Sequence, residues 1–128
     1  MNIMAKPSEN ELKILQILWD QGPSSVRDVH EKISENKESG YTTTLKLMQI
    51  MASKGIALRD TTARTHIYSA ALSEQKTKKD LLSRFISATF KGSSSSLVLQ
   101  ALGNGKTTQA ELDEIKALIS TIEKTNKV

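Results

Sequence analysis

Cysteine is absent from the 128-residue sequence, and its absence excludes three kinds of chemistry. The chain forms no disulfide, carries no thiolate nucleophile and has no zinc site built on cysteine. Apolar runs are short as well. None approaches the roughly 20 residues that a helix needs to cross a bilayer, and residues 1–7 lack the apolar centre of a signal peptide. We therefore expect a cytoplasmic protein without membrane insertion.

Complete catalytic motifs are also missing. Gly105-Lys-Thr107 resembles the end of a phosphate-binding P-loop, but the glycine needed five positions earlier is replaced by Gln100. Ser73-Glu-Gln-Lys76 matches one short motif of serine β-lactamases without its companion motifs. The two histidines, His30 and His66, have no acidic or cysteine partner at ligand spacing. We expect a protein that is not an enzyme, holds no metal and needs no cofactor.

The charge of the chain is mildly basic and unevenly distributed. The formal net charge is +4, with 38% hydrophobic and 25% charged residues, a composition typical of a folded globular protein. Residues 40–66 carry four basic side chains and one acidic, whereas residues 20–38 carry five acidic and three basic. The basic segment favours a polyanionic partner.

A helix is predicted directly after Ser8-Glu-Asn-Glu11. This spacing forms a capping box, in which the serine and the glutamate each accept a hydrogen bond from a free backbone N–H at the helix start. Leu12, Leu15 and Trp19 then recur at helical spacing, and Gly22-Pro23 ends the helix. The stripe predicts a core-facing surface that includes the tryptophan.

Two further helices follow. The first starts at Ser24-Ser25 and runs out in the charged stretch 34–39. The second starts near Gly40-Tyr41 and stops at Lys54-Gly55, since glycine is common just past a helix end. Its predicted inward residues are Thr44, Leu47, Met48 and Met51.

After Gly55 the periodicity changes from helical to alternating. Residues 56–60 and 66–70 are short and rich in strand-forming residues, and the polar stretch 61–65 between them has the composition of a turn. Three helices followed by a two-stranded hairpin are the element order of a winged helix-turn-helix. We therefore predict a mainly α fold with such a domain over residues 1–72.

The third helix and the hairpin are the predicted DNA-binding surface. In a helix-turn-helix the second helix of the motif enters the major groove, and polar side chains on it contact base edges and phosphates. A polar helix face is usually only solvated, so it indicates DNA binding here because of the order of elements around it. The predicted DNA-binding residues are Thr42, Thr43, Lys46, Gln49, Ser53, Arg59, Arg64 and His66.

The C-terminal half, residues 73–128, is predicted to be a helical dimerisation domain. Helices are expected over residues 77–90 and 97–102, and a second capping box at Thr108-Gln-Ala-Glu111 starts the last one. Three short amphipathic helices form a poor core in one chain, so we expect a homodimer. The predicted contact residues are Leu81, Leu82, Phe85, Ile86, Leu112, Ile115, Ile119 and Ile122.

Several of these segments together resemble the penicillinase repressor (BlaI/MecI) family. The similar segments are Leu12 to Trp19, Gly40-Tyr-Thr-Thr43, Leu47 to Met51, Arg64 to Tyr68, and Phe90-Lys-Gly-Ser-Ser-Ser-Ser-Leu-Val-Leu-Gln100. The resemblance covers nearly the whole chain. It implies a winged-helix repressor that dimerises through its C-terminal helices and blocks a promoter at a dyad-symmetric operator on double-stranded DNA.

The resemblance also implies a way in which repression ends. In family members a membrane sensor responds to a β-lactam, and the repressor is then cleaved in its dimerisation region. The corresponding place here is Gln100-Ala101, where prototype members have asparagine and phenylalanine. Leu45 and Ile50 stand where the family often has basic residues, which predicts a different operator sequence. The cysteine motif of copper-responsive members is missing.

The same sequence also permits a second functional interpretation, as an interaction module. A winged-helix domain also serves as a protein–protein interaction module without sequence-specific DNA binding, and the mild net charge leaves this alternative open. Competition binding against genomic fragments distinguishes the two, because a repressor selects one or a few promoters and an interaction module selects none.

Overall fold

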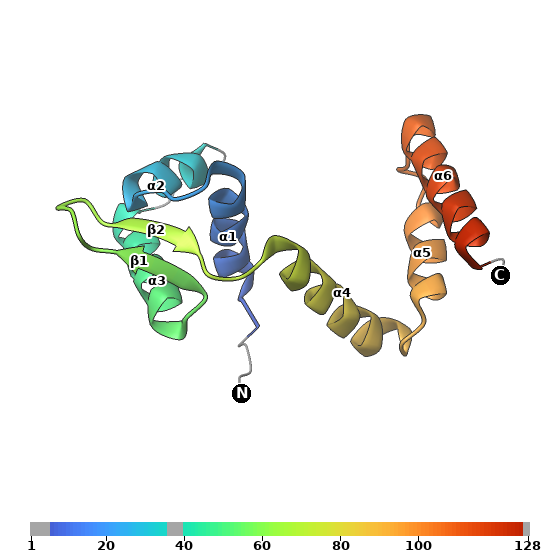
Figure 1. Ribbon diagram of the computed structural model, residues 1–128, viewed down its shortest axis with the longest axis horizontal. Helices are drawn as coiled ribbons and strands as arrows, with labels where there is room; N and C mark the ends of the chain where they lie inside the picture. Colours follow the sequence, from blue (N-terminus) through green and yellow to red (C-terminus); the bar gives the residue numbers. More distant parts are fainter. Residues whose placement is uncertain (1–5, 36–39, 127–128) are drawn as a thin grey trace. The chain divides into compact units, whose positions relative to one another are not determined.

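The computed structural model describes residues 6–35 and 40–126, so part of the N-terminal segment and part of the charged stretch 34–39 lie outside it. The chain divides into two compact units, Met1–Leu82 and Ser83–Val128. Within the described residues it has six helices and one two-stranded antiparallel sheet, which confirms the predicted fold class (Figure 1). The predicted functional boundary after Leu72 stays a prediction.

The N-terminal unit begins with three helices: α1 (Glu9–Gln21), α2 (Val26–Ser34) and α3 (Tyr41–Lys54). The capping box before α1 forms as predicted, because Ser8 Oγ accepts from the Glu11 N–H and Glu11 Oε1 accepts from the Ser8 N–H. Ser25 caps α2. Gly55 ends α3 with φ at 82°, in the left-handed region that favours glycine.

The hairpin consists of β1 (Ala57–Asp60) and β2 (Ile67–Ala70), and its connecting loop projects past the three helices (Figure 1). Ala57 pairs with Ala70 and Asp60 with Ile67. Tyr68 also exchanges two backbone hydrogen bonds with Ser24, at 2.9 and 2.8 Å, so the segment between α1 and α2 lies against β2. This pairing was not predicted from the sequence.

A single hydrophobic core holds these elements together. The predicted inward face of α3 is confirmed, with Met48 and Met51 in the core, Thr44 buried and Leu47 packed against it. Trp19 is half-buried, and its indole N–H donates to the Leu72 carbonyl at 3.0 Å. The core residues are Ile14, Leu15, Leu18, Val26, Val29, Met48, Met51, Ile56, Ala57 and Tyr68.

The remaining helices are α4 (Glu74–Phe90), α5 (Ser94–Gly103) and α6 (Gln109–Asn126). The predicted starts of α4 and α5 were each three residues late. Ser73 Oγ accepts from the Lys76 N–H, and Ser93 Oγ accepts from the Ser96 N–H. These caps lie one turn earlier than expected, which places Ser94 to Ser96 inside α5. The capping box at Thr108 and Glu111 forms as predicted.

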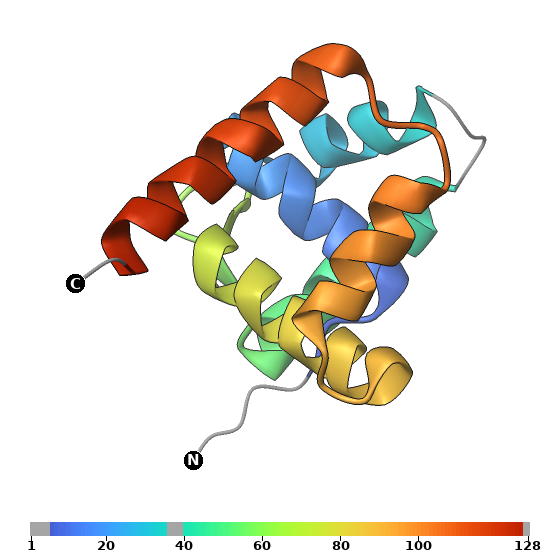
Figure 2. The same ribbon diagram turned by 90° about the vertical axis from the view of Figure 1, so that its right-hand side faces the viewer.

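The C-terminal unit has little core of its own. Figure 2 shows α5 and α6 spreading apart from the loop that joins them. Among the described residues of this unit, Ile86 is the one buried apolar side chain. The helices of this unit therefore leave most of their apolar surface uncovered in a single chain.

Candidate nucleic-acid interface

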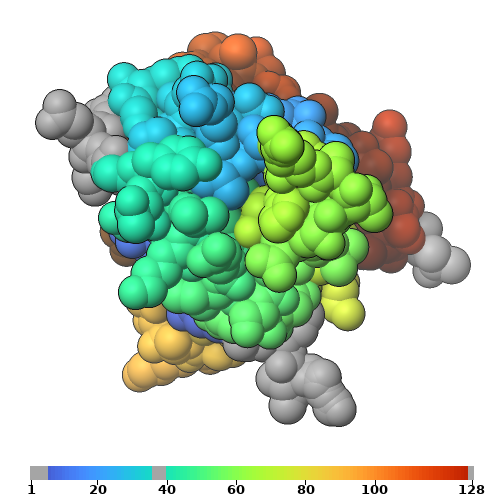
Figure 3. Space-filling model, turned by 90° about the vertical axis from the view of Figure 1, so that its left-hand side faces the viewer, coloured from blue at the N-terminus to red at the C-terminus, as the bar shows by residue number. Residues whose placement is uncertain are grey.

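All eight predicted DNA-binding residues are exposed to solvent. Five lie on α3, Arg59 lies on β1, and Arg64 and His66 lie between the strands. Figure 3 shows α3, in teal to green, and the hairpin, in yellow-green, on one face of the molecule with a hollow between them. The structure thus brings the two predicted parts of the surface together.

The helical period of α3 determines which side chains it presents to solvent. Thr44, Met48 and Met51 face the core, so positions on the opposite side of the helix point outward. That outward strip contains Thr42, Lys46, Gln49 and Ser53, with Thr43 beside it. Ile50 is exposed at the edge of the same strip. The strip therefore offers a cation, hydroxyl groups, an amide and one apolar contact.

The loop of the hairpin is ordered by its acidic residue. Asp60 Oδ1 accepts from the Thr62 N–H at 2.9 Å and from the Thr62 hydroxyl at 2.7 Å. The hydrogen bonds from the Thr62 backbone N–H and the Thr62 hydroxyl, together with the electrostatic interaction with His66, hold the pKa of Asp60 below its usual value. Asp60 thus stays ionised and serves as a turn residue, so the backbone next to the basic side chains of the hairpin is held in a defined turn.

A cleft of about 410 Å³ lies between the hairpin, the start of α2 and α3, and we call it the wing cleft. Three of the predicted residues, Gln49, Arg64 and His66, line it. Arg27 and Tyr41 line it as well, and neither was among the predicted residues. The full lining is Ser25, Val26, Arg27, Tyr41, Leu45, Gln49, Arg64, Thr65, His66 and Tyr68.

A polar cluster ties α2 to the first turns of α3. His30 Nδ1 lies 3.0 Å from the hydroxyl of the buried Thr44, and His30 Nε2 lies 3.2 Å from the Ser34 hydroxyl. The Tyr41 ring meets the His30 ring edge to face at 5.6 Å. His30 therefore holds α3 in position and is not a candidate ligand. The groups of His, Asp and Glu among the described residues form no metal-binding cluster.

The other end of α3 is anchored to α1 by an ion pair. Lys54 Nζ lies 2.9 Å from both carboxylate oxygens of Glu11, whose side chain is 3% exposed. Burial raises the pKa of Glu11, but the Ser8 N–H, the hydrogen bond from Lys54 and the Lys54 charge outweigh it and lower the pKa overall. Glu11 thus caps α1 and fixes the last turn of α3 at the same time.

The predicted dimerisation residues differ in exposure within one chain. Leu82, Phe85, Ile119 and Ile122 are exposed, whereas Ile86 is only 8% exposed and already buried. The half-buried members are Leu81, Leu112 and Ile115. Large exposed apolar residues that the sequence analysis did not include are Val98, Leu99 and Leu118.

The predicted cleavage position lies within α5. Gln100 and Ala101 are both exposed, and Gln100 lines a shallow hollow with Ser96, Leu99 and Gly103. No residue of α5 is buried. The peptide bond is accessible to a protease only after the helix opens locally, because a helical backbone does not fit an extended substrate cleft.

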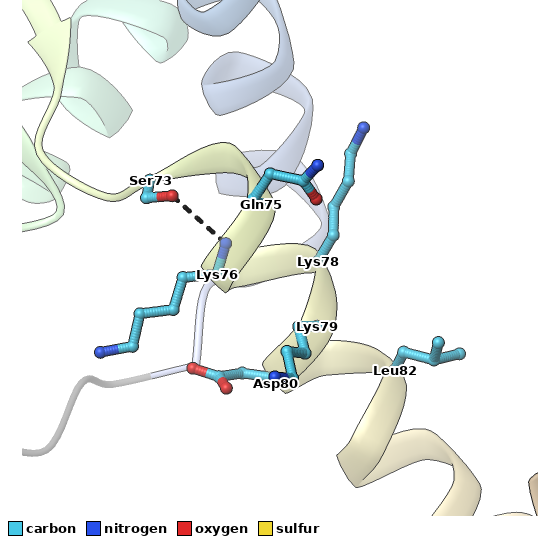
Figure 4. Close-up of a pocket in the computed structure, with 7 residues that line it drawn as sticks. All are labelled: Ser73, Gln75, Lys76, Lys78, Lys79, Asp80 and Leu82. Carbon is cyan, nitrogen blue, oxygen red and sulfur yellow. Dashed lines mark hydrogen bonds between the residues drawn. The ribbon is translucent and has the colours of Figure 1, made fainter. Parts of the chain in front are cut away.

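A further hollow of about 760 Å³ lies along the first turns of α4. Figure 4 shows that its lysines extend in different directions, with Lys76 and Lys78 pointing away from one another. Lys78 is paired with Glu74 at 2.6 Å. Side chains that diverge do not form a binding site, so this hollow is ordinary solvated surface.

Three helices with a two-stranded wing, followed by a helical region, have the architecture of a winged helix-turn-helix protein. The sequence matches the penicillinase repressor family over residues 7–121, so the chain belongs to that family. None of the helices within the described ranges is long and apolar enough to cross a membrane.

Named relatives agree with this assignment. The chain is 24% identical over 123 residues to a penicillinase repressor of Staphylococcus aureus, covering 96% of this chain and 98% of the relative. It is 24% identical over 113 residues to the methicillin resistance regulatory protein MecI of the same species, covering 88% and 92%. It is 33% identical over 60 residues to the transcriptional regulator BlaI of Mycobacterium tuberculosis, covering 46% and 44%. The predicted resemblance is confirmed, and membership in a family of repressors agrees with the expectation that the chain is not an enzyme.

Proposed function

We propose that the protein is a transcriptional repressor that binds a dyad-symmetric operator as a homodimer. The observation that carries this proposal is that α3 and the hairpin lie on one exposed face (Figure 3), and that all eight predicted side chains on these elements are accessible to solvent. The outward strip of α3 reads base edges, and the arginines of the hairpin contact phosphates.

Dimerisation is supported by the apolar surface of the C-terminal unit. Phe85 is 52% exposed and Leu99 is 71% exposed, and Leu118, Ile119 and Ile122 are also exposed. Large apolar side chains left exposed on three helices of one unit indicate a surface that a partner covers. A second copy covers it with an identical surface, and the resulting two-fold symmetry suits two operator half-sites.

Replacing Lys46 or Arg64 by alanine is expected to weaken operator binding by roughly 1–3 kcal/mol if the residue reads a base, or to lower the salt slope by about one unit per protomer if it contacts a phosphate. Both side chains are exposed, so neither change should unfold the domain. The operator is first selected from genomic fragments of the host, and binding is then followed by fluorescence anisotropy at several salt concentrations.

Lys13→Ala is the matched control, because it removes the same charge from an exposed position on α1. Its affinity should equal that of the wild-type protein. Unchanged binding of both the Lys46 and Arg64 variants contradicts the assignment of this face. Failure of the wild-type protein to select any fragment favours the alternative, a protein–protein interaction module.

Repression ends, in this proposal, by proteolysis between Gln100 and Ala101 after a membrane sensor-protease system is activated. Cleavage of this bond separates the end of α5 and all of α6 from the rest of the chain, and so removes part of the dimer surface. Local opening of α5 is inexpensive in the single chain because none of its residues is buried.

An immunoblot of the host during β-lactam exposure is expected to show a fragment ending near Gln100 as the target genes switch on. Ala101→Glu changes the residue after the bond while keeping a good helix former at an exposed position. This variant should remain full-length and keep repressing. Induction of the genes while the wild-type chain stays intact rules out cleavage as the switch.

A further inference from the structure

The wing cleft is lined by two arginines and by no acidic residue. The arginines are Arg27 and Arg64, and His66 lines the cleft with them. Of the ion pairs among the described residues, none involves either arginine. Like charges gathered at one cleft without a carboxylate repel each other, and an anion placed between them removes that repulsion.

We propose that the wing cleft binds one phosphodiester group of the DNA backbone, with Arg27 as its main ligand. This inference rests on the proposed function and adds a contact outside the outward strip of α3. Arg27 lies in the first turn of α2, whereas Arg64 and His66 belong to the hairpin. An arginine guanidinium binds a phosphate through two parallel hydrogen bonds, and the Tyr41 and Thr65 hydroxyl groups supply further donors at the same cleft.

A phosphate in this position fixes the placement of α3 in the groove. Gln49 belongs both to the lining of the wing cleft and to the outward strip of α3. A backbone phosphate held by Arg27 therefore lies beside the side chains that face the bases. Phosphate contacts set register without reading sequence, so Arg27 is a positioning residue whose loss weakens binding to all sequences alike.

The first test is the salt dependence of Arg27→Gln in the full chain. Each phosphate contact contributes about −0.9 to the slope of log affinity against log salt. The slope should become less negative by about 0.9 per protomer, both for the selected promoter fragment and for a mixed-sequence duplex of the same length. Arg27→Lys keeps the charge and should restore the slope while recovering only part of the affinity.

Lys32→Gln is the matched control, since it removes one positive charge from α2 at an exposed position outside the cleft. Its slope and affinity should be those of the wild-type protein. A slope change equal to that of Arg27→Gln would show a general effect of charge and would overturn the proposal.

The second test neutralises the phosphates one at a time with methylphosphonate linkages in the promoter fragment. One position in each half-site should weaken binding of the wild-type protein and have no effect on Arg27→Gln, because the partner of that phosphate is already missing. The absence of such a position overturns the proposal. If the wild-type protein selects promoters while Arg27→Gln matches it in slope and affinity, the cleft proposal fails and the proposed function stands. If the wild-type protein binds no duplex, both fail.

Discussion

A fragment that ends at Leu82 is expected to be a folded monomer that binds the operator about 10²–10⁴-fold more weakly than the full chain, because the second reading domain is no longer held at a high local concentration. The cut follows the first compact unit. It keeps Thr77, which is buried, and the carbonyl of Leu72 that accepts from Trp19. Sedimentation equilibrium and anisotropy titration on one promoter fragment measure the two effects.

A dimer of this fragment at micromolar concentration would contradict the assignment of dimerisation to the C-terminal helices. Two full-length variants test whether weaker binding comes from the loss of dimerisation or from the truncation itself. Phe85→Glu and Ile119→Glu place a charge on apolar positions that are exposed in the single chain, so they should give monomers with unchanged helix content. Gln109→Glu adds a charge at an exposed position at the start of α6 and should remain dimeric.

Features set by neighbouring residues were predicted well from the sequence. The capping box is recognised from the three-residue spacing between Ser8 and Glu11 alone. The end of α3 is recognised because Gly55 has no side chain and so adopts the left-handed conformation easily. The order of three helices and a hairpin follows from periodicity. The starts of α4 and α5 were late because several polar residues there are suitable caps, and periodicity does not choose among them.

Features that depend on distant residues were not predicted. Ser24 meets Tyr68 only after the chain has folded back on itself. Arg27 belongs by sequence to the acidic stretch 20–38, yet it lines the same cleft as Arg64. Counting charge along the chain therefore assigned it to the wrong surface. A helical projection would have placed Arg27 on the exposed side of α2, but only the fold places the hairpin beside it.

Glu11 has a second structural role that the sequence around it does not indicate. The capping box identified one of its partners, Ser8, and the other, Lys54, lies 43 residues away. Removing its carboxylate leaves the Ser8 N–H without an acceptor and the Lys54 ammonium without a counter-charge. Lys54 is 35% exposed and so regains some hydration, which makes the expected loss smaller than that for a fully buried pair.

Glu11→Ala is expected to lower the free energy of unfolding of the N-terminal unit by about 2–3 kcal/mol, and its Tm by roughly 8–24 °C for a unit of this size. Glu9→Ala is the matched control. It removes the same charge from the first turn of α1, but Glu9 is exposed and its loss should cost less than about 0.5 kcal/mol. Urea unfolding of both variants measures the difference, and equal stability of the two would contradict the buried pair.

The pH dependence of Glu11→Gln tests the charge separately from the cap. Glutamine keeps an oxygen acceptor for the Ser8 N–H and loses the negative charge. Because the folded pKa of Glu11 lies below its ordinary value of 4.5, the carboxylate stabilises the fold fully above pH 4.5, and this contribution disappears as the pH falls through the folded pKa. The stability difference between wild type and Glu11→Gln should therefore be constant near neutrality and shrink in acid. A difference that stays the same down to pH 3 would assign the effect to packing or capping and exclude the ion pair with Lys54 as its source.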